Sequence, residues 1–399
     1  MFQNIFNSYK QSKRIGATFL VAGTTVGAGM LAMPLTAAGI GFMTSLVLLC
    51  VMWGLMYLAA LIQVDLFKDQ PNGISLATLV ENILGKKYKI IPAVIKSLLF
   101  FSLLAAYISA SASVMVQIFH LPITVSAILF TVTLGILISL DLKKMEQFNR
   151  IIVMFKFLFF ILIAIILLPN VNFSSLFSEN QPTNYSFLII SIPVFFTAFG
   201  FHGSIPSLSS FLKQDQKTLR KVFFEGTLIP LVTYILWMAI TYSGAKICQL
   251  TNISSQTDLG QFLTHIGECS PNPFWVGLSL QWFSFFAFIT SFIGVGLGQI
   301  DFIEEVLANN SKTSSKTHLR FLASLITVTI PLLFAIFYPN GFMIALAFAG
   351  GWLCILALFL PCLMAFVKKN TPKYIKIMAS ICLTFGIALF VILILKTMS

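Results

Sequence analysis

The chain has 399 residues, of which 58% are hydrophobic and only 10% carry a charge. Soluble domains carry about 25% charged residues, so this chain has too few polar side chains to cover a soluble globule. The composition therefore excludes a soluble enzyme, a nucleic-acid-binding domain and a disordered protein, despite the formal net charge of +12.

Eleven apolar stretches are each long enough to form a membrane-spanning helix, which needs about 20 residues. They lie at residues 15–40, 42–66, 91–119, 123–140, 151–168, 185–212, 222–242, 274–307, 319–337, 342–367 and 374–395. The predicted fold class is an all-α integral membrane protein with eleven transmembrane helices and no soluble domain.

Lysine and arginine residues predict the orientation of these spans. When eleven spans are threaded in order, every Lys and Arg except Lys246 and Lys396 falls on the side of the N-terminus. Cytoplasmic loops carry the excess of basic residues, so residues 1–14 are predicted to be cytoplasmic.

Glycines interrupt the first and sixth spans at mid-depth. The residues concerned are Gly23, Thr24, Thr25, Gly27, Ala28 and Gly29 in the first span, and Phe199, Gly200, Phe201, His202 and Gly203 in the sixth. Small residues four apart also favour close helix packing. However, unwound backbone survives in a membrane only where it lines a polar cavity, and paired interruptions in spans one and six mark the binding site of an inverted-repeat transporter. The predicted repeats are residues 15–168 and 185–367, with residues 374–395 as an eleventh helix.

The chemistry of these breaks favours a zwitterionic amino acid as substrate. Free N–H groups near Gly27, at the positive end of a half-helix, would bind a carboxylate. Unwound carbonyls near Gly23 and Phe199 would accept hydrogen bonds from an ammonium group. Tyr107, Phe199, Phe201 and Phe286 are candidates for the wall of a pocket for a flat side chain, although most of the 41 phenylalanines are expected to face lipid or core.

Several segments together resemble one family. Residues 21–34 (VAGTTVGAGMLAMP) resemble the first helix of the bacterial hydroxy/aromatic amino acid permeases, and residues 199–207 (FGFHGSIPS) resemble their sixth helix. Residues 148–150, 290–294 and 337–342 match in the same order, and the whole is most similar to the tyrosine-specific permeases. The polar loop of about 30 residues between spans seven and eight departs from the family pattern.

The resemblance implies a LeuT-like fold with helices 1 and 6 broken, and a proton-driven importer of an aromatic amino acid, above all tyrosine, in the bacterial inner membrane. In related proton-coupled carriers a fifth-helix lysine replaces the sodium ion held by helices one and eight. The proton-coupling residues would then be Lys156, Thr290 and Ser291. The alternative sodium site would comprise Gly23, Val26, Ala287, Thr290 and Ser291. Lys156 could instead extend back to the membrane surface, and His202 could carry a proton, bind substrate or satisfy a freed carbonyl.

Other functional classes lack the residues they would need. The sequence has no phosphate-binding GxxxxGK[ST] motif and no HExxH or CxxC motif, so no cofactor or metal is expected. An intramembrane enzyme would have only His202 and Ser204 as a catalytic pair, and a channel would need repeated polar rings. A sodium-coupled symporter, a tryptophan or phenylalanine permease and, less favoured, a channel remain as alternatives.

Two cysteines lie in the loop between spans seven and eight, on the predicted outer side. In a bacterium that side is oxidising, so Cys248 and Cys269 are candidates for a disulfide. The alternative is two unrelated thiols that lie too far apart to be bridged.

Overall fold

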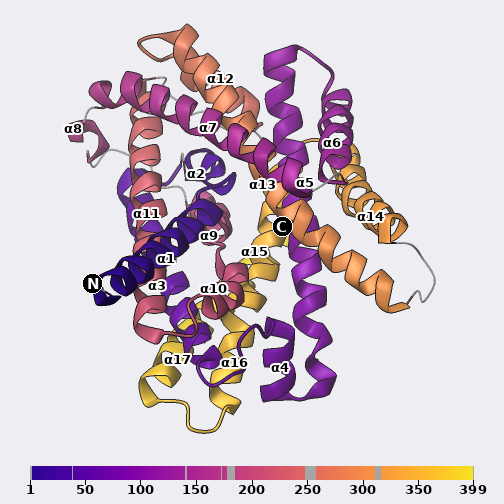
Figure 1. Ribbon diagram of the computed structural model, residues 1–399. Helices are drawn as coiled ribbons and strands as arrows, with labels where there is room; N and C mark the ends of the chain where they lie inside the picture. Colours follow the sequence, from indigo (N-terminus) through magenta and orange to yellow (C-terminus); the bar gives the residue numbers. More distant parts are fainter. Residues whose placement is uncertain are drawn as a thin grey trace.

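The computed structural model describes residues 2–37, 39–139, 142–171, 173–177, 185–247, 258–310 and 316–398. These residues are helical almost throughout, and no β-strand occurs among them (Figure 1). The all-α prediction is therefore confirmed.

The predicted spans correspond to helices of the structure. Those of the first half are α1 (Phe2–Thr25) with α2 (Gly29–Ala37), α3 (Phe42–Phe67), α5 (Ile90–Phe119), α6 (Ile123–Ser139) and α7 (Leu142–Leu167). Those of the second half are α9 (Tyr185–Ala198) with η3 (His202–Ser204) and α10 (Ile205–Phe211), α11 (Gln216–Ile247), α13 (Pro273–Asn310), α14 (Lys316–Phe337), and α15 (Phe342–Cys354) continuing through the π-helical turn η5 (Ile355–Phe359) into α16 (Leu360–Val367). The last helix is α17 (Lys373–Met398).

The chain is a multi-pass membrane protein by the length and composition of these helices. Within the described residues, nine helical segments are long and apolar enough to cross a membrane, and the bent pair α1–α2 makes a tenth. The remaining predicted span, α6, is apolar but only 17 residues long. The count of eleven is therefore not established by helix length alone.

Short helices occupy the connections, and none of them was predicted from the sequence. They are α4 (Leu76–Leu84), η1 (Lys86–Tyr88), η2 (Leu168–Asn170), α8 (Phe173–Leu176) and α12 (Leu259–Glu268). Helix α12 begins because the Asp258 side chain accepts a hydrogen bond from the Gly260 N–H at 2.6 Å, an N-cap. Its apolar face, with Phe262 and Leu263, is buried. Ten residues cannot cross a bilayer, so a search for long apolar stretches passes over this helix.

Helix α12 is attached to α5. The Gly260 N–H also donates to the Ser113 hydroxyl at 2.8 Å, and that hydroxyl is hydrogen-bonded to the Asp258 carboxylate. The helix packs on α2 and α13 as well. Figure 1 shows α12 and α8 at one end of the molecule and α4 at the other.

The spanning helices form two packed sets. In one, α5, α6, α13 and α14 pack on one another, and in the other α3, α9 and α11 pack with the two halves of the first span. Helix α7 packs along α13, and α15 packs along α5. The two broken spans, α1–α2 and α9–α10, belong to the same set.

Gly226 allows α11 to lie directly against α1. A Cβ atom at this position would be 2.7 Å from the Val21 Cβ and 3.0 Å from the Thr18 carbonyl oxygen. Because a backbone atom of α1 is one of these neighbours, the clash cannot be relieved by a side-chain rotation alone.

We therefore expect Gly226→Ala to destabilise the protein by about 1–3 kcal/mol through overpacking. Gly54→Ala on α3 is the matched control, because a Cβ there meets nothing within 4 Å. Thermal unfolding in detergent measures both variants. Equal melting temperatures would show that α1 does not depend on this contact.

Candidate functional site

The first span breaks where the sequence predicts. Helix α1 ends at Thr25 and α2 begins at Gly29, with a bend of 48° between them. The Ala28 N–H donates to the Ser291 hydroxyl of α13 at 3.3 Å, while the amide of Gly27 has no acceptor among the described residues. The turn before α2 thus presents a free N–H group, and N–H groups at the start of a helix are suited to binding anions.

The sixth span breaks in a comparable way. Helix α9 ends at Ala198, the Phe201 N–H turns back to the Phe199 carbonyl at 3.0 Å, and helical structure resumes at His202. Within the described part of the chain the Gly203 amide also lacks an acceptor. Gly200 and Gly203 are exposed, so this backbone can be reached from outside the protein.

The two breaks lie side by side. A Cβ atom on Gly29 would be 3.0 Å from the Cα of Ala198, the last residue of α9. A Cβ on Gly27 would be 3.1 Å from the Ser291 hydroxyl oxygen. Glycine at these two positions permits the close approach of α2, α9 and α13.

Tyr234 of α11 joins both breaks, and the sequence reading missed it. Its buried hydroxyl lies 2.7 Å from the Thr25 carbonyl and 2.9 Å from the Ala198 carbonyl, the last carbonyls of α1 and α9. These carbonyls have no partner within their own helices. The hydroxyl has one proton and shares it between them. A single tyrosine in an apolar span has no spacing pattern, so only its polar group at mid-span could have marked it.

The aromatic candidates fall into separate groups. Phe199 packs edge-on against Tyr234, with ring centroids 5.2 Å apart, and Tyr107 of α5 lies 6.4 Å from the Phe288 ring of α13. Phe286 instead lies in a cluster with Phe155 and Phe159 of α7, at 5.7 and 5.9 Å. The structure therefore places Phe199 at the breaks and Phe286 at the α7–α13 interface.

His202 is packed between Phe201 and the Met56 backbone. The rings of Phe201 and His202 stack with centroids 4.5 Å apart, and Phe201 also stacks on Phe223 of α11 at 5.7 Å. The Met56 backbone lies close, yet neither ring nitrogen makes a hydrogen bond of ordinary geometry to a described residue. A role in binding or proton transfer remains a prediction.

Lys156 is buried in the membrane region, with only 6% of its surface exposed. Its ammonium group lies 5.4 Å from the Phe157 ring centroid, and among the described residues it has no carboxylate partner. Helix α7, which carries it, packs along α13, the helix of Thr290 and Ser291. No hydrogen bond joins Lys156 to either hydroxyl within that part of the structure.

The hydroxyl groups of the remaining candidates bond within their own helices. Thr24 donates to the Leu20 carbonyl at 2.9 Å, and Thr25 donates to the Val21 carbonyl at 2.7 Å. Thr290 donates to the Ala287 carbonyl at 3.0 Å. Of the alternative sodium set (Gly23, Val26, Ala287, Thr290 and Ser291), Ser291 is the member whose side chain contacts the break, at Ala28.

The predicted disulfide falls partly outside the described residues. Cys269, which follows α12, is disulfide-bonded, but Cys248 is not among the described residues. The pairing of Cys248 with Cys269 therefore stays a prediction.

Solved structures and characterised relatives resemble this chain along most of its length. A manganese transporter from Eremococcus coleocola superposes with a TM-score of 0.60 at 14% identity, over 96% of this chain and 85% of that one. This likeness confirms the predicted LeuT-like fold and concerns the fold alone.

The relatives in sequence are bacterial permeases. The tyrosine-specific transport system 1 of Haemophilus influenzae is 37% identical, over 88% of this chain and 87% of that protein. The tryptophan-specific transport protein of the same organism is 28% identical, over 92% and 89%. The profile of the tryptophan/tyrosine permease family matches residues 10–398. The chain thus belongs to the tryptophan/tyrosine permease family, and it is a transporter and not an enzyme.

Proposed function

We propose that this permease imports tyrosine by proton symport across the bacterial inner membrane, with its N-terminus in the cytoplasm. The observation that carries the proposal is the pair of adjacent helix breaks with the free amides of Gly27 and Gly203. The free amide before α2 can donate a hydrogen bond to the carboxylate of an amino acid, and the exposed backbone at the second break can contact the rest of that substrate.

The choice of tyrosine rests on relatives. The tyrosine-specific system of Haemophilus influenzae is more similar to this chain, at 37% identity, than the tryptophan-specific protein, at 28%. Phe199 is the aromatic candidate at the breaks, but its side chain is fully buried against Tyr234, so it does not favour one flat substrate side chain over another. Tryptophan and phenylalanine are therefore the alternative substrates.

The break in the first span is partly exposed. Helix α1 packs mainly on α11, and its Gly23 and Thr24 are exposed at the break. At the other end α12 packs over α2, α5 and α13.

Competition for uptake tests the substrate. Unlabelled tyrosine should inhibit the uptake of labelled tyrosine into sealed vesicles more strongly than tryptophan or phenylalanine, and far more strongly than leucine or serine. A symporter should raise the tyrosine concentration inside the vesicles above the external concentration, whereas a channel should not. Stronger competition by leucine or serine than by any aromatic amino acid would contradict the assignment.

Lys156→Ala should abolish tyrosine accumulation driven by a pH gradient, because it removes the buried ammonium group of α7, while exchange of internal for external tyrosine continues in part. Lys96→Ala is the matched control, since Lys96 is an exposed lysine in α5. A Lys156→Ala variant that still concentrates tyrosine on a proton gradient rules out this coupling role. Wild-type uptake that requires sodium favours the alternative ion site.

Tyr234→Phe should weaken the apparent affinity for tyrosine by about tenfold, equivalent to about 1.4 kcal/mol. The variant leaves two buried carbonyls without their shared donor, which costs about 1–3 kcal/mol and loosens the geometry of both breaks. Tyr338→Phe, at an exposed position, serves as control. Initial uptake rates at a series of tyrosine concentrations measure the apparent affinity. An unchanged affinity in Tyr234→Phe would mean that the hydrogen bonds of Tyr234 to the two breaks do not position the site.

A further inference from the structure

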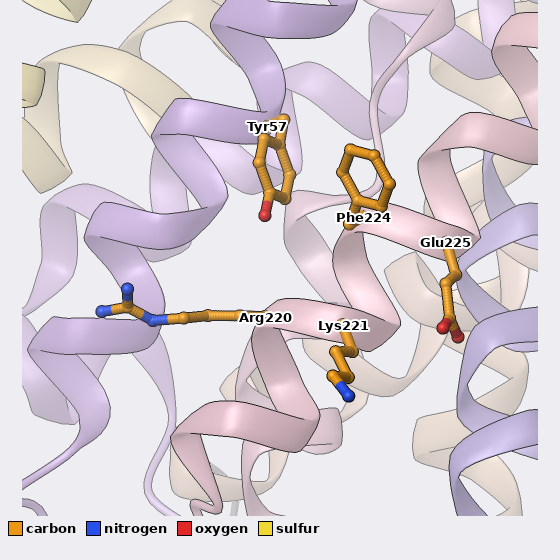
Figure 2. A pocket seen from close by; sticks show the side chains of 5 residues that line it. All are labelled: Tyr57, Arg220, Lys221, Phe224 and Glu225. Carbon is orange, nitrogen blue, oxygen red and sulfur yellow. The ribbon is translucent and has the colours of Figure 1, made fainter.

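A pocket of about 360 Å³ opens between α3 and the first turns of α11. Its lining residues are Tyr57, Arg220, Lys221, Phe224 and Glu225 (Figure 2). Figure 2 shows the Tyr57 hydroxyl and the Arg220 side chain facing the same open space. We propose that this pocket binds the phosphate of an anionic glycerophospholipid, with an acyl chain lying along α11.

The two basic side chains have no carboxylate partner. No acidic group in the described part of the chain lies within ion-pair distance of Arg220 or Lys221. Glu225, four residues after Lys221 on the same helix, pairs with Arg14 of α1, and the two charged groups lie 3.8 Å apart. Counting Arg14, the site has three cationic groups and one carboxylate, so its net charge favours an anion.

Arg220 is held in place before any ligand arrives. It donates a hydrogen bond of 3.0 Å to the Tyr374 hydroxyl of α17, and its guanidinium lies 5.7 Å from the centre of that ring. A guanidinium has five N–H donors in a planar fork, so most remain for the oxygens of a phosphate. The Tyr57 hydroxyl makes no hydrogen bond to a described residue and can donate to the same group.

The depth of the pocket matches the headgroup layer. Arg220 and Lys221 follow Gln216, the first residue of the α11 span, by four and five residues, or roughly 6–8 Å of helix. The headgroup region on each side of a bilayer is about 5–8 Å thick. Basic pockets between helices at this level are suited to anionic lipid headgroups.

An apolar track continues from the pocket into the membrane. Phe224, Leu228 and Val232 follow one another at intervals of four along one face of α11, with 42%, 36% and 52% of their surfaces exposed. Trp53 of α3 closes the side, with its ring 5.9 Å from Phe224 and its indole N–H bonded to Thr227 at 3.0 Å. A soluble phosphate would leave this track unused, and the ammonium of a zwitterionic headgroup would meet Arg220 and Lys221.

Native mass spectrometry of the purified protein tests the proposal without any transport assay. We expect phosphatidylglycerol to remain bound under conditions that remove phosphatidylcholine. Arg220→Gln combined with Lys221→Gln should weaken phosphatidylglycerol binding by about 30-fold, at the usual contribution of a basic residue near an anionic lipid surface. The control is Lys213→Gln combined with Lys217→Gln, which removes the same charge from exposed positions outside the pocket and should bind within twofold of wild type.

Arg220→Lys keeps the positive charge but not the planar guanidinium, and it should weaken phosphatidylglycerol binding by less than the double variant does. This single variant still tests the proposal if the double variant does not fold. Equal retention of both lipids would overturn the proposal, as would equal losses in the pocket and control variants. Displacement of the lipid by millimolar glycerol 3-phosphate would also overturn it and would identify a site for soluble anions.

Discussion

The hydroxyl of Tyr234 is the single group to which the carbonyl ends of both broken helices are bonded. Inside a membrane no bulk water is available to satisfy these carbonyls, so a break in a spanning helix requires a donor from the protein. Tyr234 provides one proton for two acceptors, at 2.7 and 2.9 Å, and Ser291 accepts the Ala28 amide from the opposite side. The carbonyls of the break are bonded to the protein, whereas the amides that remain free can bind a ligand. The same unwinding of the helix therefore creates both the need for Tyr234 and the free donors of the site.

The packing of the helices indicates what moves and what stays together. Helices α2 and α9 are tied to each other, since the Ser191 hydroxyl donates to the Thr36 carbonyl at 2.9 Å, and the Tyr242 hydroxyl of α11 bonds to the Ala37 carbonyl. Helix α1 is tied to α11 as well, by the Tyr234 hydroxyl at the Thr25 carbonyl and by the close contact at Gly226. Movement of α1 at the first break would therefore require these contacts with α11 to change.

The fold and the location of the site could be predicted from residue patterns because both rest on local constraints. Mid-span glycines such as Gly27 and Gly200 indicate unwinding because they occur together in the first and the sixth span, and the positions of basic residues predict how the spans alternate across the membrane. Tyr234 and α12 could not be predicted in this way. The role of Tyr234 depends on two carbonyls 36 and 209 residues away in the chain, and α12 is too short to register as a span. Phe286 was a candidate for the wall of the site but lies at the α7–α13 interface, because aromatic character alone does not predict which neighbours a ring will contact.

The π-helical turn at Ile355–Phe359 changes the rotational register of the tenth span. In a regular α-helix, residues eight positions apart differ by about 80° around the axis, but one extra residue in a turn removes about 100° of that rotation. Cys354 and Cys362 are consequently brought to nearly the same face, where both are fully buried. Cys354 contacts the Gly386 carbonyl and Cys362 contacts Cys382, both on α17. A sulfur-lined seam therefore joins α17 to the bundle, and deletion of a single residue from η5 would leave it in place, because two residues seven positions apart in a regular α-helix also lie on nearly the same face.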